Sequence, residues 1–283
     1  MNQFRNGDLV FDVRDEGPAD GDVVILLHGF PQTKAAWDDV IPGLASAGYR
    51  VLAPDQRGYS PGARPTGRRS YTGAHLVGDV LALADAAGAD SFHVVGHDWG
   101  GAVAWNVAMW HPDRLRTVTS IATPHPAAFR RALLTSSQLL RSWYFLMFQL
   151  PRVPEWVATS KRGRPRFRQA FLRSGLSEDK LDEYLAVFDD PDAPTCIFNW
   201  YRGVAFTPPA DMSHTVTVPT LYIYGARDVA LGSKAAQLTA NHVSGPYRYE
   251  HLDQASHWIP EEAPDTVVRL LLEHFASAPA SAP

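Results

Sequence analysis

The sequence predicts an α/β protein in which a mostly parallel, doubly wound sheet carries helices on both faces. Short apolar segments that end in Gly, His or Asp alternate with longer segments whose apolar residues have helical spacing. Such repeated β–α units place neighbouring strands parallel and cover both faces of the sheet. A chain of 283 residues can bury roughly three quarters of the surface it exposes when unfolded, which permits one large core.

The first part of the chain contains four predicted strands and three predicted helices. Each strand is a short apolar run bounded by Gly, Pro or Asp. The strands are expected at 22–29, 49–55, 91–97 and 116–125, and the helices at 35–47, 70–88 and 99–110. Gly88 closes the second helix, in keeping with the preference for glycine at helix C-termini.

The strand pattern stops near residue 126 and resumes about ninety residues later, a gap too long for a bare loop. The intervening residues are helical and irregular stretches rich in Arg, Leu and aromatic side chains. Strands return at 219–228 and 246–253, and a last helix is expected at 263–275. We therefore expect a core of residues 1–125 and 216–276, a helical cap of residues 126–215, and a disordered tail at 277–283.

Composition and charge limit the kinds of partner that the protein is expected to bind. The net charge of −4 gives no bulk attraction to nucleic acid or to an anionic membrane. The chain has no apolar run of about 18 residues, and its first residues do not have the pattern of a secretion signal. Cys196 is the single cysteine, which excludes an intrachain disulfide. We expect a cytoplasmic protein that binds a small apolar molecule, without nucleic acid or membrane partners; a homodimer is a further expectation.

The stretch GHDWGG at 96–101 places Asp98 between a predicted strand and a predicted helix. A reactive residue with Gly two positions before and after it is typical of a nucleophile elbow, whose sharp turn leaves no room for Cβ atoms. The usual occupant is serine, and here it is a carboxylate. An Asp that only caps the helix N-terminus is the simpler alternative.

Three further features match a catalytic triad with its oxyanion hole: one precedes Asp98 in the chain, and two follow it. The stretch HGFP ends an earlier predicted strand, so that the N–H groups of Phe30 and Trp99 could face one oxygen. Asp228 ends the predicted strand TLYIYGARD, and His257 follows the last predicted strand. The order of Asp98, Asp228 and His257 is therefore nucleophile, acid, histidine.

As a set, these motifs resemble the α/β-hydrolase family and, within it, the epoxide hydrolases. The resemblance runs from about residue 4 to about residue 275. It rests on HGFP, GHDWGG, GARD and SHW, with QLPRVPE and NWYRG similar to the cap of that branch. It implies the α/β-hydrolase fold with a helical cap inserted after the sixth strand, and it implies neither a cofactor nor a metal.

The resemblance also implies roles for residues of the cap. Tyr201 in NWYRG occupies the position of a tyrosine that opens the epoxide ring. Met147 occupies the position of the second such tyrosine, and Tyr144 lies one helical turn earlier as a candidate substitute. Pro31, Tyr144, Met147 and Trp200 are expected to contact the substrate.

An aspartate in the nucleophile elbow limits the kinds of substrate carbon that the protein can attack. Its carboxylate is ionised at pH 7 and needs no base for its attack. Attack on a saturated carbon that bears a strained or good leaving group forms an alkyl ester on Asp98. Water activated by His257, which Asp228 orients, then hydrolyses this ester. The expected reaction converts an epoxide and water to a vicinal diol; Asp55, which also follows a strand, is a weaker candidate for the acid.

Two alternatives accompany this prediction. A haloalkane dehalogenase would use the same Asp98, with Trp99 as a halide donor, although that branch often has Asn where this chain has Phe30. The fluoroacetate branch places Arg after the nucleophile, where this chain has Trp99. A catalytically silent, ligand-binding member of the family is the other alternative.

Overall fold

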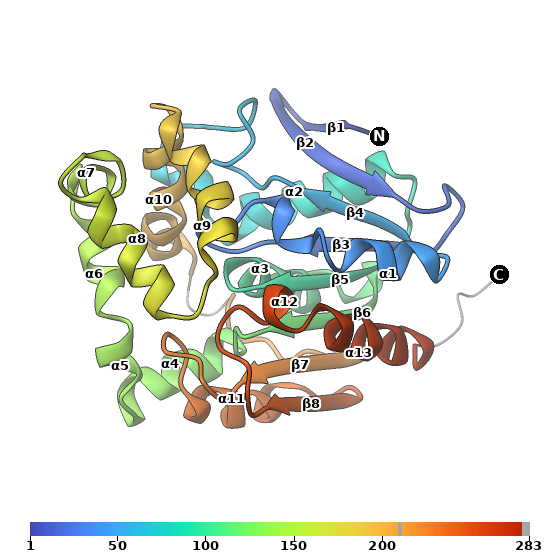
Figure 1. Ribbon diagram of the computed structural model, residues 1–283. Coiled ribbons are helices and arrows are strands. Elements are labelled where there is room, and N and C mark those ends of the chain that lie inside the picture. The colour runs from blue at the N-terminus through green and yellow to red at the C-terminus, as the bar shows by residue number, and fades with distance from the viewer. Residues whose placement is uncertain (209–210, 279–283) are drawn as a thin grey trace.

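A computed structural model describes residues 1–208 and 211–278. Within them, eight strands form one sheet in the order β1-β2-β4-β3-β5-β6-β7-β8 (Figure 1). Strands β3 to β8 are parallel, and β1 and β2 extend one edge antiparallel. The mostly parallel sheet confirms the predicted fold class. The strands are β1 (Gln3–Asn6), β2 (Leu9–Glu16), β3 (Val23–Leu27), β4 (Arg50–Pro54), β5 (Phe92–His97), β6 (Leu115–Ile121), β7 (Thr220–Gly225) and β8 (Tyr247–Leu252).

The strands at the antiparallel edge, β1 and β2, were not predicted from the sequence. In β2 only Phe11 and Val13 are buried, and charged residues such as Asp12 and Arg14 alternate with them. This alternation is typical of a strand with one solvated face. Of the six predicted strands, β3 to β7 are buried over nearly all their length, which is the pattern of strands covered on both faces. Strand β8, at the other edge of the sheet, is polar and only partly buried.

Helices cover both faces of the sheet. On the near side in Figure 1, α1 (Ile41–Ser46) packs against α13 (Pro264–Ala276), whereas α2 (Gly73–Ala86) packs against α3 (Trp99–Trp110). The shorter helices α11 (Ser233–Thr239) and α12 (Ile259–Glu262) follow β7 and β8. Gly88 has a φ of +74° directly after the end of α2, which confirms its predicted role in ending that helix.

The single helix predicted at 35–47 is wrong. The chain instead forms a 3-10 turn, η1 (Lys34–Trp37), and then the separate helix α1. Pro42 lies in the first turn of α1. Proline has no N–H to donate to the turn before it, so a helix that continued through this position would lose a hydrogen bond and meet the proline ring.

A helical segment joins β6 to β7, as the predicted insertion after the sixth strand requires. It consists of α4 (Pro126–Thr135), α5 (Gln138–Arg141), α6 (Trp143–Gln149), α7 (Val153–Thr159), α8 (Arg164–Arg173), α9 (Glu178–Leu185) and α10 (Ala193–Gly203), with the 3-10 turns η4 (Ala186–Asp189) and η5 (Val204–Phe206). We call α4 to α10 the inserted helices. Figure 1 shows α6 to α10 grouped beyond one end of the sheet.

The inserted helices pack on the loop after β3 through aromatic side chains. The ring of Phe30 lies 5.3–6.3 Å from six aromatic rings of the inserted segment: Phe148, Phe167, Phe171, Phe188, Phe198 and Tyr201. Ring pairs at these separations contribute beyond the area that they bury. The side chain of Phe30 therefore fixes the loop whose main chain lies in the site described below.

At the C-terminal end, Ser277 and Ala278 donate main-chain hydrogen bonds to the last turn of α13. The rest of the predicted disordered tail, residues 279–283, lies outside the described residues. In the described part of the chain, each helix is too short or too polar to cross a bilayer.

Candidate active site

Asp98 lies on a sharp turn between β5 and α3. Its φ of +50° and ψ of −117° are unusual for a residue with a side chain. A Cβ on Gly96 would overlap the carbonyl oxygen of Gly100, and a Cβ on Gly100 would overlap that of Leu27. Both glycines are therefore required by the close approach of the backbone. The side chain of Asp98 accepts no capping hydrogen bond from α3, so it does not act as a helix cap.

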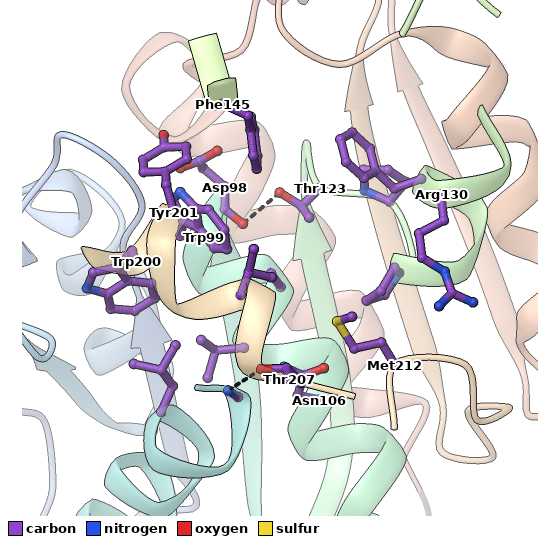
Figure 2. Close-up of a pocket in the computed structure, with 18 of the residues that line it drawn as sticks. Asp98, Trp99, Asn106, Thr123, Arg130, Phe145, Trp200, Tyr201, Thr207 and Met212 are labelled. Carbon is purple, nitrogen blue, oxygen red and sulfur yellow. Dashed lines mark hydrogen bonds between the residues drawn. The ribbon is translucent and has the colours of Figure 1, made fainter. Parts of the chain in front are cut away.

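The Asp98 carboxylate has donors on two sides. Its Oδ1 accepts the Phe30 N–H at 2.9 Å, and its Oδ2 lies 3.6 Å from Nε2 of His257. Thr123 braces the turn by donating its hydroxyl to the main-chain oxygen of Asp98 at 2.6 Å (Figure 2). Burial acts against ionisation, but His257 and the Phe30 N–H outweigh it and lower the pKa of Asp98. The carboxylate is therefore ionised at neutral pH.

His257 lies between two carboxylates. Its Nδ1 is 2.7 Å from Oδ2 of Asp228, whose other oxygen accepts the N–H groups of Ala230 and Leu231 at 2.7 and 2.8 Å. Burial lowers the pKa of His257, but the charges of Asp228 and Asp98 overcome this and raise it well above its ordinary value. The ring is consequently an imidazolium at neutral pH.

The alternative acid, Asp55, has a different role in the structure. Its Oδ1 accepts the Lys34 N–H at 2.8 Å, and its Oδ2 forms an ion pair with the Lys34 ammonium. These bonds hold the start of η1 against the end of β4. The two carboxylates that face His257 are those of Asp98 and Asp228.

Two polar residues that support the site were not identified from the sequence. His97, the last residue of β5, places Nε2 2.8 Å from the carbonyl oxygen of His257 and Nδ1 2.8 Å from Oε1 of Gln32. Gln32 Oε1 also accepts the Gly29 N–H at 2.8 Å. Burial lowers the pKa of His97 to about 4. His97 and Gln32 thus connect the loop after β3 to the loop that carries His257. The position of His97 beside Asp98 in GHDWGG was the available signal.

Two tyrosines of the inserted helices lie over Asp98. The ring of Tyr201, from α10, packs edge-on against Trp99 with centroids 4.9 Å apart, and the ring of Tyr144, from α6, is 6.1 Å from that of Tyr201. Burial, followed by the charge of Asp98, raises the pKa of both tyrosines. Both hydroxyls therefore remain protonated at neutral pH. Met147 lies one turn further along α6, partly buried against the core.

Asp98 and both tyrosines line a cavity of about 300 Å³ (Figure 2). Trp200 lines it as well, and its indole N–H is donated to the carbonyl oxygen of Arg57 at 2.7 Å. Among the described residues that line the cavity, Pro31 and Met147 do not appear, and their substrate contacts stay predictions. The remaining walls are largely apolar side chains from α3, α4 and α6, which suits an apolar ligand.

Comparison with known proteins identifies the family. A family model described as alpha/beta hydrolase fold matches residues 22–264, so the chain belongs to the α/β-hydrolase family. The chain is 36% identical over 282 residues to AB hydrolase superfamily protein YfhM of Bacillus subtilis, covering 96% of this chain and 97% of that protein.

Other relatives narrow the family to one branch. The chain is 34% identical over 301 residues to Epoxide hydrolase A of Mycobacterium tuberculosis, covering 92% of each. The crystal structure of Epoxide Hydrolase A from Mycobacterium thermoresistibile superposes with a TM-score of 0.82 at 28% identity and covers 98% of each chain. These matches confirm the predicted epoxide hydrolase branch and identify the chain as a hydrolase.

Proposed function

We propose that the protein is an epoxide hydrolase that converts an epoxide and water to a vicinal diol. The observation that carries the proposal is the pairing of an ionised Asp98 with two protonated tyrosines on the walls of one largely apolar cavity. A carboxylate attacks a saturated carbon, and a phenol protonates the alkoxide that leaves. The names of two of the three relatives cited, Epoxide hydrolase A from two Mycobacterium species, support the same reaction.

In the first step, a carboxylate oxygen of Asp98 attacks one carbon of the epoxide. The C–O bond of the ring breaks, its electron pair goes to the oxygen, and that oxygen takes a proton from Tyr201 or Tyr144. The products are an alkyl ester on Asp98 and a tyrosinate. The imidazolium of His257 then returns a proton to the tyrosinate, so that His257 becomes neutral as the next step requires.

Formation of the ester prepares His257 for the second step. Esterification removes the negative charge of Asp98, one of the two charges that raise the pKa of His257. The neutral ring takes a proton from water, and the hydroxide adds to the ester carbonyl. The N–H of Phe30, 2.9 Å from Oδ1 in the free protein, and the N–H of Trp99 stabilise the oxyanion. The C–O bond of the ester breaks, its electron pair goes to the diol oxygen, and that oxygen takes the proton of the newly added hydroxyl. The diol then leaves, Asp98 is again a carboxylate, and His257 is the imidazolium formed when it took the proton from water.

A single turnover in ¹⁸O-labelled water tests this route. With protein in excess over a terminal epoxide, the first diol should contain the oxygen of Asp98 and no label, while the label enters Asp98. Label in the first diol would refute the ester. The same preparation is assayed for halide release from a bromoalkane, because a haloalkane dehalogenase would release halide rapidly and leave the epoxide unchanged.

The finer expectations on organisation are also proposals. We propose that the inserted helices form the predicted cap of residues 126–215 over a core of residues 1–125 and 216–276. We also propose that the protein is cytoplasmic. We assign the homodimer contact to the segment from α4 to α7, because exposed apolar side chains gather in this part of the sequence and large exposed apolar surfaces mark interaction sites. The segment carries the exposed side chains Leu134, Leu139, Leu140, Trp143, Leu146, Leu150, Val153 and Trp156. Light scattering should give a dimer that Trp143→Gln with Leu146→Gln converts to a monomer; a monomeric unmodified protein would refute the assignment.

A further inference from the structure

The cavity extends well beyond Asp98 along one face of α3. Four residues of this helix line it, at the spacing of one helical face: Trp99, Ala102, Val103 and Asn106. The facing wall from α4 repeats the spacing with Pro126, Phe129, Arg130 and Leu133. At 1.5 Å per residue, Asn106 lies about 12 Å further along the helix axis than Asp98. The cavity therefore accommodates a substrate much longer than the epoxide ring.

The walls between these ends are mainly apolar, but the far end is polar. Asn106 and Thr207 lie there, at the opposite end of the view from Asp98 (Figure 2). They are only 8% and 6% exposed. The Thr207 hydroxyl accepts the Gly73 N–H at 2.9 Å, and within the described part of the chain no hydrogen bond donated by this hydroxyl is found.

The Asn106 side chain has an unmet hydrogen-bonding requirement. Its Oδ1 is buried and has no hydrogen-bond partner among the described residues. Burying an amide oxygen without a hydrogen bond costs folding free energy. An apolar residue of the same size would fill this part of the cavity wall without that cost. Among the described residues, no hydrogen bond joins the Asn106 side chain to a neighbouring helix.

We propose that Asn106 and Thr207 form a distal subsite for a neutral hydrogen-bonding group of the substrate. The matching group both donates and accepts, as a hydroxyl or a carboxamide does. The substrate class is then an epoxide joined to such a group by an apolar spacer that reaches along α3, about 12 Å at most. This assignment deepens the proposed function and rests on it.

Matched substrates test the subsite. The kcat/KM is measured for a terminal alkyl epoxide, for its ω-hydroxy analogue and for its ω-carboxylate analogue, all of one chain length that reaches Asn106. The unmodified protein should prefer the hydroxyl to the methyl terminus by about tenfold, the effect of one net hydrogen bond. Asn106→Leu should abolish this preference, chiefly through KM.

Two controls separate the hydrogen bond from shape and charge. Val103→Leu narrows the same stretch without altering polarity, so it should leave the hydroxyl-to-methyl ratio unchanged. Arg130 also lines the cavity. A strong preference for the carboxylate that disappears in Arg130→Gln would overturn the neutral class of ligand. An equal hydroxyl-to-methyl ratio in the unmodified protein and in Asn106→Leu would overturn the subsite itself.

A binding measurement keeps this test distinct from that of the proposed function. Calorimetry compares an alkane-1,2-diol with the corresponding 1,2,ω-triol, which mimic the products. Tighter binding of the triol that is lost in Asn106→Leu supports the subsite even if epoxides are not turned over, and in that case the proposed function alone has failed. Equal binding of diol and triol refutes the subsite. Thermal melting of Asn106→Leu and of a second variant, Asn106→Ser, verifies that the comparison is made on folded protein.

Discussion

Removal of the Tyr144 hydroxyl, in Tyr144→Phe, is predicted to slow ester formation and to leave ester hydrolysis unchanged. Tyr144 and Tyr201 both line the cavity with Asp98, and their rings are 6.1 Å apart. Since burial and the Asp98 charge raise the pKa of both tyrosines, each hydroxyl is protonated and able to donate at neutral pH. The leaving alkoxide can therefore receive hydrogen bonds from both.

The size of the effect follows from the charge that the hydroxyl stabilises. A hydrogen bond to a charged oxygen contributes about 1.5–3 kcal/mol, which corresponds to roughly 10- to 150-fold in rate. We expect Tyr144→Phe and Tyr201→Phe each to slow ester formation by this factor. The double variant loses the whole contribution of a general acid, on the order of 10² to 10⁴-fold or more.

Rapid mixing with excess epoxide, acid quenching and intact-mass detection of the ester measure the step directly. Packing is preserved in Tyr144→Phe, because the ring keeps its contacts with Phe145 and Phe148, whose centroids are 5.2 and 5.7 Å away. Met147→Leu, on the same helix and not among the described residues that line the cavity, is the matched control. If Tyr144→Phe forms the ester at the unmodified rate and Tyr201→Phe forms none, Tyr201 acts alone and the proposed sharing is refuted.

Four further predictions concern the triad and its turn. His257→Gln should form the ester but not hydrolyse it, so that one adduct per chain accumulates in the intact mass; sustained turnover would exclude His257 as the base. Asp228→Asn removes one of the two charges that raise the pKa of His257, so the rise of kcat with pH should move to lower pH while kcat falls by about 10⁴-fold; an unshifted pH profile would contradict this. The raised pKa of His257 has a consequence for stability as well. The stability that the protonated ring contributes is fully present below the pKa of an unfolded histidine, near 6.5, and is lost as the pH rises through the pKa of His257 in the folded protein. In urea unfolding, the free energy of unfolding of the unmodified protein should therefore fall more than that of His257→Gln as the pH becomes alkaline. Gly100→Ala should melt at a lower temperature, because the added Cβ would overlap the carbonyl oxygen of Leu27; an unchanged melting temperature would refute the steric requirement.

Part of the candidate site could be predicted because its signals are local. The glycines around Asp98 are close to it in sequence, and the strand-to-helix context of GHDWGG is visible in the hydrophobic pattern. Likewise Asp228 follows β7 and His257 follows β8, and both strands could be predicted, β7 from its apolar run. The carboxyl ends of parallel strands lie at one edge of a sheet, so the order of these residues already implied that they meet.

Other features of the site could not be predicted because they depend on contacts between distant segments. Whether Tyr144 or Met147 faces the cavity depends on how α6 is rotated against α10, and sequence spacing alone left both possible. The link from His97 through Gln32 to the His257 loop joins three segments that are far apart in the chain. No motif surrounds Asn106 in the sequence, and only the packing around it in the folded protein leaves its amide oxygen without a partner.

The sequence by itself determined the parallel sheet, the turn that holds Asp98 and the chain order of the three triad candidates. Each of these is set by short-range physics: apolar periodicity, the absence of Cβ atoms at two glycines, and the ionisation of a carboxylate at neutral pH. The tertiary structure alone decided which tyrosines lie over Asp98, how far the cavity extends and where its polar end lies. Those properties arise from the packing of the inserted helices on the sheet, where the neighbours of a side chain come from segments more than one hundred residues away, as with Phe30 and Tyr201, and no local pattern specifies them.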